Sequence, residues 1–193
     1  MKNLFNILVL MTLLSCKVTE QRVDKAQVYF DIDSLYSDYL VSFSEDREFA
    51  PGNSCGYKNS KGEIVIPKGK YSHCFTDTFK NFAFVSDDRL TNSKVVAIDR
   101  NEKILFDAYM FDNGPDWMTE GLFRIKRNGK IGYADKNGVV IIEPKFECAN
   151  QFKNGIARVA LNCRIVESES DSEHSRGESD SWFYIDKKGN RVK

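Results

Sequence analysis

The residues best suited to chemistry in this chain are five cysteines and two histidines, because thiolates and imidazoles serve as nucleophiles, bases and metal ligands. A Ser/His/Asp or Cys/His triad would have to use His73 or His174 as its base. His174 falls in a polar, serine-rich insert, which is a poor place to hold a catalytic geometry. No Cys-x-x-Cys pair occurs, and only His73 lies beside a cysteine, Cys74. We therefore expect no catalytic residue, no bound metal and no cofactor.

Four of the cysteines, Cys55, Cys74, Cys148 and Cys163, are candidates for disulfide bonds. Four cysteines allow three pairings, and we favour the two local ones, Cys55 with Cys74 and Cys148 with Cys163. The alternative is that all four are buried free thiols. Disulfides persist only in an oxidising compartment, so this expectation depends on where the chain is delivered.

The first sixteen residues are typical of an export signal. Lys2 precedes the mostly apolar segment Leu4–Leu14, which is eleven residues long. A membrane-spanning helix needs about 20 apolar residues, so this segment is too short to span a bilayer. The segment ends in Leu13-Leu14-Ser15-Cys16, which resembles the lipobox of bacterial lipoprotein signal peptides.

That resemblance implies that residues 1–15 are removed as a signal peptide and that Cys16 carries acyl chains such as palmitate. Several acyl chains give a stable membrane anchor. Residues 16–26 would then be the lipidated cysteine and its tether. Lys17 follows the cysteine where an Asp would signal retention, which implies a lipoprotein of the bacterial cell envelope held at the outer membrane. Periplasmic or surface orientation stays open, and an ordinary secretion signal with a chance cysteine is the alternative.

The charge balance and one carboxylate pair bear on function. Lys+Arg 28 against Asp+Glu 28 argues against nucleic acid as a partner, which would favour a basic face. Asp31 and Asp33 follow the apolar residues Val28–Phe30 and resemble the first motif of haloacid-dehalogenase-type phosphatases. That chemistry needs strands alternating with helices, a pattern that the rest of the chain lacks. We therefore treat the match as accidental and keep an envelope hydrolase using such carboxylates as the catalytic alternative.

One unit recurs along most of the chain. Gly56–Pro67 and Gly132–Pro144 share a Gly-Tyr pair, a polar turn and an apolar run that ends in proline. Weaker copies are Val96–Phe106 and Trp182–Val192. The turns are spaced by 40, 36 and 51 residues, and the last spacing becomes 36 without a 15-residue insert at 167–181. The turn positions are Gly62, Glu102, Gly138 and Gly189.

A second line of similarity follows each turn. Phe79–Val85 lines up with Phe152–Val159, and Met118–Ile125 falls between them. Short apolar runs with a period of two predict strands, and Asn137-Gly138 favours a hairpin turn. We predict an all-β repeat array of about four three-stranded antiparallel units, arranged either as an open curved stack or as a propeller-like array.

The pattern resembles the WG-repeat family, whose unit reads roughly Trp-Gly-Tyr-Ile-Asp-x-x-Gly-x-x-Val-Ile-x-Pro, then an aromatic residue, then Phe-x-x-Gly-Leu-Ala-x-Val. The resemblance covers residues 55–193, and residues 27–54 would be N-terminal strands or a degenerate repeat. The Trp-Gly pair is eroded, because Cys55-Gly56, Ile131-Gly132 and Trp182-Phe183 keep at most one member each. The family implies a secreted or envelope β-repeat protein and brings no catalytic residues.

Two surface features could recognise a partner. Arg124 and Arg158 occupy matching positions that alternation points outward, and Lys80 matches Lys153. Such a cationic row would meet an anionic protein or glycan, unless it is only a solvated sheet face. The insert 167–181 carries six acidic residues and six serines, which favours a solvated disordered loop. Its functional alternative is a loop that holds a divalent cation or a cationic partner.

The function expected from these features is a non-catalytic binding or scaffolding module, held near the membrane through acylated Cys16, with a protein or glycan as its partner. The alternatives are the envelope hydrolase and an immunity-type protein that binds a toxin.

Overall fold

The computed structural model describes residues 39–44, 54–90, 92–168 and 171–192. The expected signal peptide (1–15), the lipidated Cys16 with its tether (16–26) and most of the N-terminal segment 27–54 lie outside these residues, as do Asp31 and Asp33. Within the described ranges every regular element is a β-strand, and no helix could cross a membrane.

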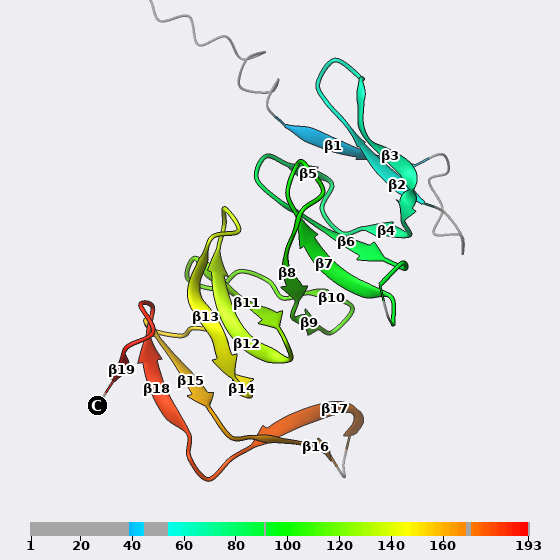
Figure 1. Ribbon diagram of the computed structural model, residues 1–193. Helices are drawn as coiled ribbons and strands as arrows, with labels where there is room; N and C mark the ends of the chain where they lie inside the picture. Colours follow the sequence, from blue (N-terminus) through cyan, green and yellow to red (C-terminus); the bar gives the residue numbers. More distant parts are fainter. Residues whose placement is uncertain (1–38, 45–53, 91, 169–170, 193) are drawn as a thin grey trace, which may run out of the picture. The chain divides into compact units, whose positions relative to one another are not determined.

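The described strands form four three-stranded antiparallel units, which we call the first to the fourth unit in chain order (Figure 1). The second and third units belong to one seven-stranded sheet, because β8 pairs with β11 through Ile125 opposite Ala108. None of the sheets formed by the described strands closes into a barrel. The expected all-β repeat array is therefore confirmed. The units consist of β1 (Leu40–Phe43), β2 (Cys55–Lys58) and β3 (Ile64–Tyr71); β6 (Ala83–Asp87), β7 (Lys94–Ile98) and β8 (Ile104–Ala108); β11 (Leu122–Arg127), β12 (Lys130–Asp135) and β13 (Val140–Phe146); and β15 (Ile156–Ala160), β18 (Phe183–Asp186) and β19 (Arg191–Val192).

The boundaries of the sequence repeat do not coincide with the boundaries of the three-stranded unit. The last strand of one sequence repeat pairs with the first strand of the next: β15 pairs with β18, with Arg158 opposite Tyr184. At the N-terminal end, β1 pairs with β2 in the same way, with Ser42 opposite Tyr57. Each unit is therefore assembled from two neighbouring repeats, which ties consecutive repeats together through backbone hydrogen bonds.

The remaining strands either extend the sheets of the units or form two separate two-stranded hairpins. These are β4 (His73–Cys74), β5 (Thr78–Phe79), β9 (Met110–Phe111), β10 (Gly114–Pro115), β14 (Cys148–Ala149), β16 (Arg164–Ser168) and β17 (Asp171–Glu178).

The hairpin β16–β17 replaces the disordered loop expected at 167–181. Its register runs from Arg164 opposite Glu178 to Glu167 opposite Ser175. The first strand of the hairpin includes Ile165 and Val166, which precede the acidic insert and have high β-propensity. The expectation was wrong because it considered only the composition of the insert and not the strand that leads into it.

The four turns are stabilised by the same pattern of hydrogen bonds from the backbone to one side chain. The side-chain oxygens of Asn59, Asp99, Asp135 and Asp186 each accept hydrogen bonds from the backbone N–H groups two and four residues later. The residue three positions later has a positive φ in every copy: 81° at Gly62, 62° at Glu102, 77° at Gly138 and 83° at Gly189. Glu102 thus adopts the conformation that glycine adopts in the other three turns.

Gly56 and Gly132 are required by close approach of the neighbouring strand. A Cβ atom would lie 2.5 Å from the Ile66 carbonyl oxygen at Gly56 and 2.4 Å from the Ile142 carbonyl oxygen at Gly132. Both glycines lie where the register with the following strand shifts. This close approach is the physical reason why both positions hold glycine, although neither glycine follows a tryptophan.

Three hydrophobic clusters lie between consecutive units. The cluster between the first and second units contains Tyr57 and Val85, and the cluster between the second and third contains Phe106 and Ile125. The cluster between the third and fourth units contains Tyr133 together with Val159. Each unit therefore buries its apolar side chains against its neighbours.

Candidate functional site

The structure separates the four predicted surface cations. Arg124 is only 6% exposed, so the expectation that it faces solvent is wrong. Alternation along β11 does place Arg124 on the opposite face from Ile125, but that face is covered by residues 109–117 and 149–152. Arg158, Lys80 and Lys153 are exposed. The predicted row is therefore not a continuous cationic surface.

Arg124 is held in a closed polar site. Its Nε and Nη2 atoms donate to the two oxygens of Asp116 at 2.9 and 2.7 Å, and its Nη1 atom donates to the Ala149 carbonyl oxygen at 3.2 Å. The guanidinium lies 4.0 Å from the ring centroid of Tyr109. Gln151 donates a further hydrogen bond to Asp116 at 2.8 Å. Burial lowers the pKa of Arg124, but the Asp116 carboxylate outweighs it, so the net pKa lies above the usual value.

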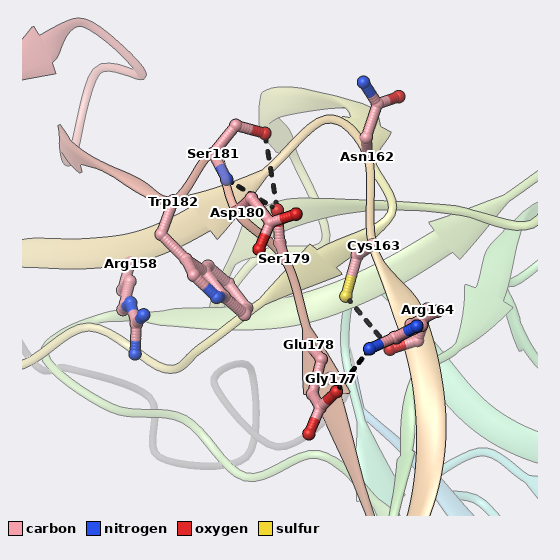
Figure 2. Close-up of a pocket in the computed structure, with 10 residues that line it drawn as sticks. All are labelled: Arg158, Asn162, Cys163, Arg164, Gly177, Glu178, Ser179, Asp180, Ser181 and Trp182. Atoms are coloured by element: carbon pink, nitrogen blue, oxygen red, sulfur yellow. Dashed lines mark hydrogen bonds and ion pairs between the residues drawn. The ribbon is translucent and has the colours of Figure 1, made fainter.

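Arg158 occupies the corresponding position in the fourth unit and is open to solvent. Its guanidinium lies 4.4 Å from the ring centroid of Trp182, a distance at which a cation is attracted by the face of the indole. Figure 2 shows Arg158 beside Trp182 at one end of a groove. Tyr184 lies directly opposite Arg158 on β18 and is 48% exposed.

The groove has a volume of about 690 Å³ and runs from Arg158 and Trp182 to the base of the hairpin β16–β17. Arg164 and Glu178 face one another across the hairpin, with Nη2 and Oε2 3.1 Å apart. The groove therefore combines an aromatic face with both signs of charge and several hydroxyls. Its lining residues are Arg158, Asn162, Cys163, Arg164, Gly177, Glu178, Ser179, Asp180, Ser181 and Trp182.

Strand β17 of the hairpin packs directly against the disulfide between Cys148 and Cys163. A Cβ atom at Gly177 would lie 2.4 Å from the Cys148 Sγ atom and 2.9 Å from the Cys163 Sγ atom. Only glycine lets β17 approach the disulfide so closely. The disulfide and Gly177 thus position one wall of the groove.

The other disulfide joins Cys55 to Cys74, so the two bonds in the structure are the local pairs favoured from the sequence. His73 packs edge-on against Phe75, with ring centroids 4.4 Å apart, and the side chain of His174 lies outside the description. No group of three or more His, Cys, Asp or Glu side chains in the described residues could hold a metal ion.

The two predicted lysines belong to different depressions. Lys153 lines a depression of about 460 Å³ together with Arg158 and Tyr184. Lys80 lines another of about 480 Å³, near Phe82 and Lys136. Lys153 and Arg158 thus lie at one place, whereas Lys80 does not join them.

Sequence reasoning missed the aromatic residues of the site. Trp182 was noted only as a remnant of the Trp-Gly pair, and Tyr184 was not singled out. A signal for Tyr184 did exist, because it aligns with Tyr57 and Tyr133 when the turns at Asn59, Asp135 and Asp186 are superimposed. Both of those tyrosines are buried, and each hydroxyl donates to a backbone carbonyl.

Comparison with known proteins identifies the repeat. The family described as WG containing repeat matches residues 56–89 and 131–162, which run from β2 into β6 and beyond, and from β12 through β15. No curated protein and no solved structure shows significant similarity to the chain.

Proposed function

The chain carries repeats of the WG family, and from this premise we propose that it is a lipid-anchored module of the bacterial cell envelope that binds a protein partner without catalysing a reaction. The observation that carries the proposal is the groove of the fourth unit, where Arg158 lies against Trp182 beside the hairpin β16–β17.

The groove favours a peptide over a small molecule. It is an open channel of polar and charged groups with one large aromatic side chain, whereas small-molecule sites are mostly enclosed and apolar. Arginine and tryptophan are the residues that most often dominate the binding energy of protein interfaces. A partner that lays a chain segment along β15 and β18 would contact both.

The anchor rests on the sequence. Lys2, the apolar segment Leu4–Leu14 and Cys16 have the order and spacing of a lipoprotein signal. Replacing Cys16 with Ser removes the thiol that would carry the lipid, so the variant is expected to leave the membrane fraction. A Cys16→Ser protein that stays fully membrane-bound would refute lipid anchoring without touching the binding proposal.

Crosslinking in intact envelopes tests the binding function. We expect the full chain to capture one dominant protein, and a variant lacking 167–181 to lose it, because the deletion removes residues 177–181 from the groove wall. The control is Arg127→Gln, which alters an exposed strand arginine of the third unit. Capture that survives the deletion would place the partner elsewhere, and no captured protein would contradict the binding module.

A further inference from the structure

The third and fourth units contain the same cross-strand pair in different surroundings. Arg124 on β11 lies opposite Tyr133 on β12, and Arg158 on β15 lies opposite Tyr184 on β18. Directly opposed residues project from the same face of a sheet. Tyr133 is 1% exposed, whereas Tyr184 is 48% exposed. The fourth unit therefore presents to solvent the face that the third unit buries.

In the third unit this face is closed by a carboxylate. Asp116 lies eight residues before Arg124 and accepts hydrogen bonds from the Arg124 backbone N–H at 3.0 Å and from two guanidinium nitrogens. The segment that presents Asp116 also supplies two rings to the guanidinium, Tyr109 at 4.0 Å and Phe111 at 5.4 Å. The internal occupant of this site is thus an acidic side chain on an aromatic-rich peptide segment.

In the fourth unit the carboxylate is missing. The residue eight positions before Arg158 is Asn150, a neutral amide, in the place of Asp116. Among the side chains that the structure describes, no carboxylate contacts the Arg158 guanidinium, and its neighbour is Trp182. The charge of Arg158 is therefore available to an anion from outside the unit.

The charges around Arg158 suit such an anion. The depression that Arg158 shares with Tyr184 is also lined by Lys153, and none of its seven lining residues is acidic. The acidic residues Glu178 and Asp180 line the adjoining groove instead, and Glu178 is ion-paired with Arg164. The depression is lined by Asn150, Gln151, Lys153, Asn154, Ile156, Arg158 and Tyr184.

We propose that the face formed by Arg158, Tyr184 and Lys153 binds a carboxylate side chain carried by a peptide segment of a protein partner, in the role that Asp116 has toward Arg124. The inference rests on the proposed binding function and names the chemistry of its partner. Arginine binds a carboxylate through two parallel hydrogen bonds, so recognition depends on the guanidinium fork as well as on charge.

The segment of the chain that contains Asp116 provides the peptide with which the proposal is tested. A synthetic peptide with the sequence of residues Tyr109–Met118, amidated at its C-terminus and carrying Asp112→Asn so that Asp116 is its one carboxylate, is titrated by calorimetry into the full chain in detergent. A second peptide that also carries Asp116→Asn is titrated beside it. We expect saturable binding of the first peptide and at least about tenfold weaker binding of the second, since a charge-assisted hydrogen bond is lost. Arg158→Gln is expected to cause the same loss, whereas the strand control Arg127→Gln leaves the affinity unchanged.

Three results would overturn the inference: no binding of the acidic peptide, equal affinity for the acidic and amide peptides, or unchanged affinity in Arg158→Gln when near-UV circular dichroism shows a native fold. If the chain associates with itself and Arg158→Gln abolishes that association, the partner is a second copy of this chain. Envelope crosslinking separates the two proposals. A partner captured equally by Arg158→Gln and wild type leaves the binding module standing and refutes the carboxylate site, whereas peptide binding without any captured partner refutes the module alone.

Discussion

The surroundings of Arg124 and Arg158 differ although the two residues occupy the same position of the repeat. Arg124 is enclosed between the third and fourth units with a carboxylate, a carbonyl oxygen and an aromatic ring as its partners. Arg158 is exposed and stacked on Trp182. The same arginine therefore stabilises the contact between two units where a neighbouring unit covers it. Where the face is open, it can bind a partner.

The two sites also differ in what the cation does for stability. At the closed site the charge of Arg124 is removed from water, and it is tolerated because Asp116 compensates for it. At the open site water solvates the guanidinium of Arg158, so this charge needs no ion pair to be stable. The comparison therefore predicts a large cost for disturbing one site and a small cost for disturbing the other.

The largest expected effect comes from Asp116→Asn. The substitution leaves the Arg124 charge buried without its counter-ion, which costs about 3 kcal/mol in the free energy of unfolding. Arg158→Gln, which removes the arginine of the open site, is expected to change this free energy by less than about 0.5 kcal/mol. Urea denaturation of both variants measures the difference. Equal losses would mean that the two sites are not as different as their exposure indicates.

A second, smaller effect is expected at Gly132. Alanine there would place a Cβ atom 2.4 Å from the Ile142 carbonyl oxygen and 2.6 Å from the Pro144 nitrogen, so β13 must shift away from β12. We expect Gly132→Ala to lower the free energy of unfolding by about 2 kcal/mol. The control is Gly114→Ala, whose Cβ atom would meet nothing within 4 Å. A neutral Gly132→Ala would show that the β12–β13 pair can relax and that the close approach does not require glycine at this position.

The features that could be predicted from the sequence depend only on contacts within one repeat. The turn at Asp135 and Gly138 is visible because the side-chain oxygen and the positive φ act within five residues. Local cysteine spacing likewise pointed to the pairs that the structure joins. The burial of Arg124 was missed because alternation along a strand defines two faces without saying which one another unit covers. The covering groups, Asp116 and Ala149, come from outside β11.

Acid should weaken the polar contact between the third and the fourth units. Glu120 of the third unit accepts hydrogen bonds from the backbone N–H groups of Gly155 and Asn154 and pairs with Lys187, with the nitrogen 3.3 Å from Oε2. These contacts, with the Gly155 bond foremost, hold the pKa of Glu120 below its usual value. A lowered folded-state pKa stabilises the fold above the unfolded value, and that contribution is lost as the pH falls through the folded value.

The fluorescence of Trp182, followed from pH 7 to pH 2.5 in a Trp117→Phe background because the chain has two tryptophans, measures this weakening. We expect an acid transition below about pH 4 in the wild type, and a shallower dependence in Glu120→Gln, which has no carboxylate to titrate. Glu143→Gln is the control, because Glu143 is an exposed strand glutamate paired with Arg127. Identical acid curves for all three proteins would remove Glu120 as a link between the units.

The smallest effect on stability, and the sharpest test of the comparison, comes from Asn150→Asp. The substitution restores the spacing of eight residues between a carboxylate and an arginine that Asp116 and Arg124 have in the third unit. Because Arg158 is exposed, the new pair should change the free energy of unfolding by only about 0.5 kcal/mol. The same carboxylate would compete for Arg158 and repel an incoming one, so affinity for the Tyr109–Met118 peptide should fall at least about fivefold. If the affinity stays the same, Arg158 does not bind the peptide's carboxylate, and the likeness between the two arginine sites ends at their position in the sheet.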